Sequence, residues 1–251
     1  MKNEGALGAF SPLRPEWPAP ANVHAAFTRR GGGVSRGPYA ALNLGRSSGD
    51  EPAAVDENRR RALAALGVPA EPSWIRQVHG TAVVRAPLAQ PEPEADACYT
   101  TGRNVVCLVQ SADCLPVLFC DDAGSVVAAA HAGWRGLAAG VLEETVRALP
   151  VPPATLMAWL GPAIGQDKFE VGAEVRTAFV ARDAQAGAHF RASAPEKFLA
   201  DLCGLARAQL AAAGVTRVYG GHWCTVSDPG AYFSYRRDGA CGRMAALIWL
   251  G

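Results

Sequence analysis

Short apolar runs alternate with segments of helical periodicity along most of this chain. Many of the apolar runs are hydrophobic at both alternating positions, which is typical of strands in a sheet that is covered on both faces. The runs that predict strands are residues 23–29, 73–78, 82–85, 105–110, 116–120, 126–130, 155–160, 216–219 and 244–249. Short turns such as HGT and DDAGS join some of these runs, so antiparallel pairs are expected.

The helical segments show apolar residues at a period near 3.6. After the sequence GWRG, Leu137, Val141, Thr145 and Leu149 recur every four positions and predict one apolar helix face. Similar patterns predict helices over residues 52–66, 172–180 and 199–213. Together the two periodicities predict an α/β layered protein. Because Pro and Gly are spread along the chain and form no linker, a single domain over residues 22–251 is expected, after an N-terminal extension of residues 1–21.

Composition narrows the range of partners. The chain has 251 residues, of which 49% are hydrophobic, so it can bury a sizeable core. Its 24 basic and 23 acidic residues give a net charge of +1 without a Lys/Arg block. This balance predicts no nucleic-acid partner and no anionic-membrane anchor, and it favours small-molecule partners. The pattern carries no signal for an oligomeric state.

Location is predicted from apolar length and cysteine use. No stretch reaches the roughly 18 apolar residues of a membrane span, and MKNEGALGAFSPLRPEWPAP lacks the apolar region of a signal peptide. Seven cysteines are an odd number on a long chain, unlike a disulfide framework. A cytoplasmic location is therefore expected, in which a special cysteine would serve as a thiolate ligand or a nucleophile.

Three residues at the ends of predicted strands form a candidate metal site. His79 precedes Gly80 after the run SWIRQV, His131 closes the run AAAH, and Cys114 interrupts two apolar runs in SADCLPVLF. Imidazole and thiolate are ligands that zinc favours, and three protein ligands leave a fourth position open, as in catalytic sites. The separations of 35 and 17 residues match no local template.

Other interpretations of these residues stay open at this point. Each histidine could be a satisfied core or turn residue, and Cys114 could be a small buried hydrophobe. A Cys–His hydrolase would use Cys114 as nucleophile and His131 as base. A non-enzymatic binding module is a further alternative. A copper oxidase is disfavoured, because five scattered histidines without an HxH pair cannot furnish several copper centres.

Seven motifs in order give the chain a family resemblance. They are FTRRGGGVSRGPYAALNLG, RQVHG, ADACYTT, SADCLPVLF, AAAHAGWRGLAAGV, GPAIGQDKFEVG and FSYRRDGACGRMAALIWL. From about residue 22 to the C-terminus the chain resembles the YfiH-like purine nucleoside phosphorylase family, formerly described as polyphenol oxidases or laccase-domain proteins. Two departures concern QDK, where many relatives carry a cysteine, and Cys241, which replaces a common threonine.

The resemblance implies a fold, a metal and an activity. The fold would be a mixed β core flanked by helices, similar to the cytotoxic necrotizing factor catalytic domain. His79, Cys114 and His131 would bind Zn²⁺. The activity would be phosphorolysis of adenosine, inosine, guanosine and methylthioadenosine, with adenosine deamination in addition. Some bacterial members are linked to peptidoglycan editing, which makes amide hydrolysis of a cell-wall precursor the alternative.

Such chemistry needs further side chains beside the ligands. Asp113, next to Cys114, is a candidate proton shuttle, although adjacent strand residues point in opposite directions. The H-x-E and P-C-x-x-C signature of zinc deaminases is missing, so deamination would use a different scaffold. Arginine suits phosphate through its planar fork, and amides suit sugar hydroxyls or base edges. The candidate substrate- and phosphate-binding residues are Asn43, Arg59, Gln77, Arg135 and Arg236.

Overall fold

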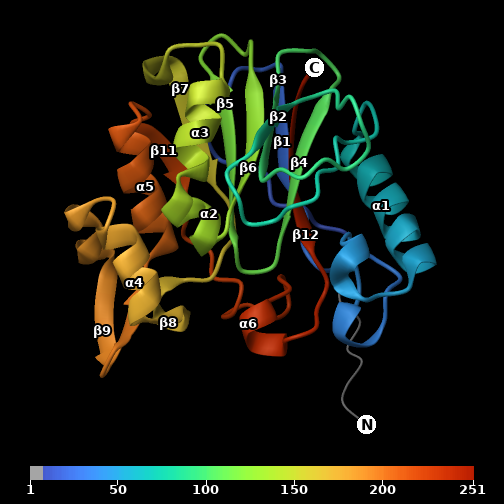
Figure 1. The fold of residues 1–251 in the computed structure, drawn as a ribbon. Helices are drawn as coiled ribbons and strands as arrows, with labels where there is room; N and C mark the ends of the chain where they lie inside the picture. The colour runs from blue at the N-terminus through green and yellow to red at the C-terminus, as the bar shows by residue number, and fades with distance from the viewer. Residues whose placement is uncertain (1–7) are drawn as a thin grey trace.

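A computed structural model describes residues 8–251 (Figure 1). The strands are β1 (Val23–Phe27), β2 (Val83–Arg85), β3 (Ala97–Thr100), β4 (Val106–Ser111), β5 (Leu115–Asp121), β6 (Val127–Ala132), β7 (Leu156–Leu160), β8 (Glu170–Gly172), β9 (Phe190–Ala194), β10 (Lys197–Ala200), β11 (Arg217–Gly220) and β12 (Met244–Leu250). The α-helices are α1 (Pro52–Leu66), α2 (Trp134–Ala139), α3 (Val141–Ala148), α4 (Ala173–Val180), α5 (Leu202–Ala212) and α6 (Tyr235–Asp238).

A mixed six-stranded sheet lies at the centre, in the order β11-β7-β5-β6-β3-β2. Its inner pairs are antiparallel, whereas β11 pairs with β7 and β2 with β3 in parallel. A three-stranded antiparallel sheet, β1-β12-β4, packs against one face of the six-stranded sheet, and β8-β10-β9 forms a small separate sheet. The predicted α/β class with a mixed β core is confirmed.

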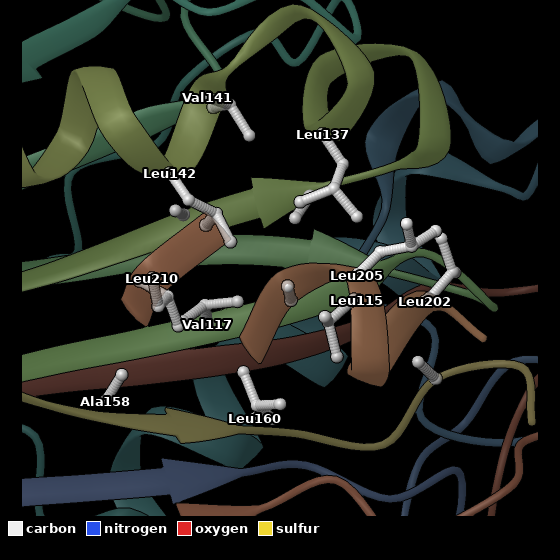
Figure 2. Close-up of a cluster of buried hydrophobic side chains, with 14 of the residues drawn as sticks. Leu115, Val117, Leu137, Val141, Leu142, Ala158, Leu160, Leu202, Leu205 and Leu210 are labelled. Carbon is white, nitrogen blue, oxygen red and sulfur yellow. The ribbon is translucent and has the colours of Figure 1, made fainter. Parts of the chain in front are cut away.

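Both main sheets are covered on both faces. Helices α2, α3 and α5 lie on one side of the six-stranded sheet, the three-stranded sheet lies on the other, and α1 covers the outside of the latter (Figure 1). Along β5, Leu115 and Val117 face the helices, where they meet Leu137 and Leu205 (Figure 2). Leu118 belongs to the core between the two sheets. Two-sided burial explains why strands such as β7 and β12 are apolar at every position.

The predicted strand at 73–78 is wrong. This segment makes only isolated bridges, from Ser73 to Cys107 and from Arg76 to Glu94. Further along, the main-chain N–H groups of Val78, His79 and Gly80 bond to a carboxylate side chain and not to a neighbouring strand. The sheet instead contains β3, which the apolar pattern missed because Asp96 precedes this short strand and threonine ends it.

The predicted helix after GWRG is two helices. Gly140 adopts a left-handed conformation with φ 103°, which separates α2 from α3. The predicted helix over 199–213 starts later, because its first two residues belong to β10 and Asp201 caps α5 by accepting a hydrogen bond from the N–H of Gly204. Pro52 and Gly67 bound α1 as the pattern predicts.

Two further findings concern the chain's periphery. Within the predicted N-terminal extension, Leu13 forms a bridge with Phe27 of β1, and residues 1–7 lie outside the described part. Among residues 8–251, none of the helices combines the length and apolar character needed to cross a membrane.

Gly140→Ala should lower the free energy of unfolding by about 2 kcal/mol or more, because a side chain at this φ is strained. Its Cβ would also lie 2.9 Å from Nη1 of Arg182. Gly67→Ala is the matched control, since Gly67 has φ 65° and no atom within 4 Å of its built Cβ, so about 1 kcal/mol is expected. Urea denaturation measures both losses. Equal losses would contradict a role for the Arg182 contact.

Candidate metal centre

The fold brings His79, Cys114 and His131 together. Their ligand atoms all lie within 4.8 Å of one another, and Sγ of Cys114 is 3.8 Å from Nε2 of His79. The two imidazole rings are 4.9 Å apart between centroids, at an interplanar angle of 72°. His131 lies in β6 and Cys114 directly precedes β5, the adjacent antiparallel strand, whereas His79 comes from a loop. His79 is exposed and His131 is buried, so the cluster opens to solvent on one side.

A buried carboxylate that the sequence analysis missed orients two of these residues. Asp96 is fully buried, and its Oδ1 lies 2.9 Å from Nδ1 of His131. The same carboxylate accepts hydrogen bonds from the main-chain N–H groups of Val78 (3.2 Å), His79 (3.0 Å) and Gly80 (2.6 Å). Asp96 therefore fixes the loop that carries His79 and the ring of His131 at once.

This carboxylate resembles the partner that metal-binding histidines commonly have. A ligating histidine usually donates its second ring N–H to a carboxylate or a carbonyl, which sets its tautomer and orientation. With Nδ1 of His131 bonded to Asp96, Nε2 is left for the cluster. A search for an acidic residue at the start of a predicted strand could have found Asp96, but ADACYTT was not assigned to a strand.

Glycine is required where the chain leaves β6. A Cβ atom at Gly133 would lie 2.7 Å from Cδ2 of His79 and 3.1 Å from Sγ of Cys114. A Cβ at Gly136, in the first turn of α2, would lie 2.8 Å from the main-chain oxygen of Gly80. Helix α2 can therefore approach the His79 loop closely only because both positions lack a side chain.

The electrostatics favour a charged pair within the cluster. Burial by itself raises the pKa of the Cys114 thiol, but the imidazoles of His131 and His79 outweigh it and lower the pKa to about 6. Burial also lowers the pKa of His131, but the Cys114 thiolate and Asp96 outweigh it and raise the pKa to about 9. Without a metal the pair is therefore thiolate and imidazolium near neutral pH.

The donor set fits zinc. One thiolate and two imidazoles are the ligands of some catalytic zinc centres, and the open side leaves room for a fourth ligand. Over residues 8–251 this is the one group of three or more metal-ligating side chains found. Several copper centres would need more such groups, so the donor set does not fit multi-copper chemistry.

Asp113 stands beside Cys114 in a left-handed conformation, with φ 87°. Its Oδ2 accepts hydrogen bonds from the hydroxyl of Ser234 (3.0 Å) and the main-chain N–H of Arg236 (2.7 Å), and the hydroxyl of Thr225 donates to Oδ1. These contacts tie the Cys114 segment to the start of α6. They favour a positioning role, and the proton-shuttle role stays a prediction.

Three of the predicted substrate-binding residues make internal contacts. The carbonyl of Asn43 accepts hydrogen bonds from the main-chain N–H groups of Gly45 and Arg243. The guanidinium of Arg59 donates to the main-chain oxygen of Leu44, and its carbon lies 3.4 Å from the centroid of the Trp74 ring. The side-chain amide of Gln77 donates to the main-chain oxygen of Gln110 and accepts a hydrogen bond from its N–H. Their contacts are structural, and their roles in substrate binding stay predictions.

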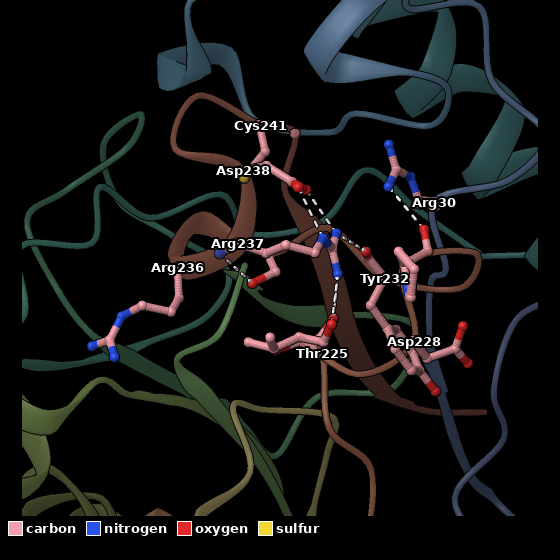
Figure 3. Close-up of polar contacts among 12 residues, drawn as sticks. Arg30, Thr225, Asp228, Tyr232, Arg236, Arg237, Asp238 and Cys241 are labelled. Carbon is pink, nitrogen blue, oxygen red and sulfur yellow. Dashed lines mark hydrogen bonds and ion pairs between the residues drawn. The ribbon is translucent and has the colours of Figure 1, made fainter. Parts of the chain in front are cut away.

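The other two lie on segments that adjoin the cluster. Arg135 is exposed at the start of α2, four residues after His131, with its guanidinium carbon 4.4 Å from the centroid of the Trp134 ring. Arg236 is the second residue of α6, and its guanidinium donates to the main-chain oxygen of Glu170. Figure 3 shows this side chain extending away from Arg237 and its partners. The geometry leaves both arginines accessible to an anion.

Asp96→Asn should weaken zinc binding by about 10- to 100-fold, because His131 loses the carboxylate that orients it. Competition with a chromophoric chelator measures the affinity. Asp121→Asn is the matched control, since Asp121 accepts hydrogen bonds from Ser125 at the opposite end of β5 and should leave zinc affinity unchanged. Unaltered affinity in Asp96→Asn would show that Asp96 does not support the site.

Zinc binding to the metal-free protein should release about one proton between the two pKa values, about 6 for Cys114 and about 9 for His131. In this window Cys114 is already a thiolate, whereas His131 must lose its proton to become a ligand. The release should fall as pH rises through the pKa of His131. Calorimetry in buffers of different ionisation enthalpy counts the protons, and no release in this window would contradict the charged pair.

Comparisons with known proteins match nearly the whole chain. A family model described as multi-copper polyphenol oxidoreductase laccase matches residues 24–251. "Purine nucleoside phosphorylase PA4543" of Pseudomonas aeruginosa is 54% identical over 95% of this chain and 98% of that protein. "Purine nucleoside phosphorylase YfiH" of Escherichia coli is 53% identical over 94% of this chain and 97% of that protein.

Solved structures show the same fold. The Neisseria meningitidis protein NMB0706 aligns with a TM-score of 0.92 at 52% identity, over 95% of this chain and 98% of that chain. YlmD from Geobacillus stearothermophilus aligns with a TM-score of 0.91 at 32% identity, over 97% of each chain. With relatives more than half identical over nearly their whole length, the chain belongs to the family described as multi-copper polyphenol oxidoreductase laccase.

Proposed function

We propose that this protein is a zinc-dependent purine nucleoside phosphorylase that also deaminates adenosine. The observation that carries the proposal is the solvent-open cluster of His79, Cys114 and His131. Relatives at 46–54% identity that bear the name purine nucleoside phosphorylase support it. The substrates we propose are adenosine, inosine, guanosine and methylthioadenosine, with inorganic phosphate as the co-substrate.

His79, Cys114 and His131 would hold the zinc, with Asp96 keeping the Nδ1 proton of His131 in place. When bound, zinc supplies a Lewis acid that polarises a ligand oxygen or lowers the pKa of a water molecule. Asp96 also holds the loop of His79 through three main-chain N–H groups, so the protein fixes these ligands before substrate arrives.

In phosphorolysis, a phosphate oxygen bonds to C1′ of the ribose while the bond from C1′ to the base breaks. The base leaves with the electron pair of that bond and takes up a proton, so the products are the free base and ribose 1-phosphate. Arg135 and Arg236 are the side chains we propose to bind the phosphate, because both are exposed on segments joined to the cluster.

The proton that the departing base takes up is the one that the attacking hydrogen phosphate loses, so the step balances without a proton from a side chain. Asp113 uses both carboxylate oxygens in hydrogen bonds to Thr225, Ser234 and Arg236. We therefore propose that Asp113 holds the Cys114 segment in its left-handed conformation. As a zinc ligand His131 would keep only its Nδ1 proton, which is bonded to Asp96, so His131 would not supply a proton to the base.

A Cys–His hydrolase is the second candidate, and one observation favours it. The thiol of Cys114 has its pKa lowered to about 6 beside His131, which in turn bonds to Asp96. This is the order of nucleophile, base and orienting carboxylate that covalent hydrolases use. The same residues would then act on an amide, as the alternative of a cell-wall precursor amidase requires.

We also propose a cytoplasmic location and small-molecule partners. All seven cysteines are free in the described structure, in keeping with a reducing compartment. The net charge of +1 supports partners other than nucleic acid or an anionic membrane.

Incubation of the purified protein with adenosine should yield adenine and ribose 1-phosphate only when phosphate is present, and inosine with or without phosphate. Chromatography separates these products. Formation of neither product, together with hydrolysis of a muropeptide precursor, would overturn the purine assignment.

Cys114→Ser should lose stoichiometric zinc. It should lower kcat/KM for adenosine by more than roughly 100-fold, because loss of a ligand costs more than loss of a residue that only hydrogen-bonds to a ligand. Elemental analysis of protein purified without added metal reports the zinc. Cys203→Ser is the control, because Cys203 is a half-buried thiol on α5 and should keep both zinc and activity. Full activity in metal-free protein would instead support the Cys–His hydrolase.

A further inference from the structure

Two large apolar side chains are exposed in the described part of the chain, and each lies on a segment that bonds to a carboxylate beside the metal cluster. Val78 is 46% exposed and Tyr235 is 61% exposed. Val78 directly precedes His79, and its main-chain N–H is held by Asp96. Exposed apolar side chains gathered around a polar site commonly mark the place where a ligand is bound.

Tyr235 reaches the cluster from the other end of the sequence. Its two chain neighbours, Ser234 and Arg236, both donate to the carboxylate of Asp113, the residue before Cys114. Figure 1 shows α6, which begins at Tyr235, near the end of the six-stranded sheet where α2 also lies. Tyr235 and Val78 therefore lie on two separate segments, which Asp113 and Asp96 hold next to the cluster.

The Tyr235 ring is supported by a fixed neighbour. The guanidinium carbon of Arg243 lies 6.0 Å from the ring centroid. Arg243 is itself held, because its Nη1 donates to the main-chain oxygens of Cys241 (2.8 Å) and Gly242 (3.1 Å). A cation near an aromatic ring is attracted to its π-system. Arg243 thus favours one placement of the ring while most of its surface stays open.

We propose that Tyr235 is the stacking platform for the base of the nucleoside, with Val78 as a second apolar contact, a role that rests on the proposed function. The ribose C1′ would lie at the cluster and the base would extend onto the ring. Stacking depends on flat area more than on the hydrogen-bonding pattern. A platform of this kind accepts adenine, guanine and hypoxanthine alike and favours purines over the smaller pyrimidines.

The test compares Tyr235→Ala with Tyr235→Phe in the zinc-loaded full-length protein. Loss of the ring should raise the Kd and KM for adenosine by roughly 10-fold or more, the scale of base–aromatic stacking. The KM for phosphate should stay unchanged, and Tyr235→Phe should behave as the wild type. The preference in kcat/KM for adenosine over uridine should also shrink in Tyr235→Ala. Val78→Ala should give a smaller rise in the KM for adenosine.

Tyr219→Ala is the control for loss of an aromatic side chain, because Tyr219 lies on the sheet-edge strand β11. It should leave the Kd for adenosine unaltered. Calorimetry measures the Kd of each variant independently of turnover, and zinc content and thermal unfolding report whether each variant is intact.

The outcomes separate this inference from the proposed function. If the wild type phosphorolyses adenosine and Tyr235→Ala shows the same Kd and KM, the platform is wrong and the activity stands. If the wild type binds adenosine without turnover and Tyr235→Ala loses binding, the activity is wrong and the platform stands. A wild type that neither binds nor converts adenosine overturns both. A lower molar mass in solution for Tyr235→Ala with an unchanged Kd would mean that the ring covers a second copy of the chain.

Discussion

The buried carboxylate of Asp96 is the interaction on which the candidate site depends. It accepts hydrogen bonds from three successive main-chain N–H groups and from Nδ1 of His131. Desolvation of a carboxylate is costly unless its charge is compensated by hydrogen bonds. Burial by itself would raise the pKa of Asp96, but the bonds from His131 and Gly80 outweigh it and lower the pKa. The carboxylate that stabilises this loop thus also orients two of the metal-ligating residues.

The layered core gives this site its rigidity. Helices cover one face of the six-stranded sheet and a second sheet covers the other, so β5 and β6 are buried along their whole length. His131 lies in β6 opposite Pro116 of β5, and Cys114 directly precedes the first residue of β5. Side chains on packed strands are held more precisely than side chains on loops, and the loop residue His79 gains equivalent support from Asp96.

A second carboxylate connects the C-terminal segment to the site. Asp113 receives hydrogen bonds from Thr225, Ser234 and Arg236, which places the start of α6 beside the Cys114 segment. One carboxylate, Asp96, therefore organises the metal ligands, and the other joins them to the surface that carries Tyr235. The family description as a multi-copper laccase does not match this arrangement, because the described residues contain one group of three metal-ligating side chains.

The sequence by itself determined the layered α/β class, most strands and helices, and the residue types of the metal cluster. Burial repeats with period 2 in strands and about 3.6 in helices, so it leaves a local trace in the sequence. Tertiary structure alone decided that Asp96 bonds to His131, that 73–78 is no strand, that Gly140 divides a helix, and that Tyr235 lies beside Asp113. These features depend on strand order and on contacts between distant segments, which local periodicity does not encode.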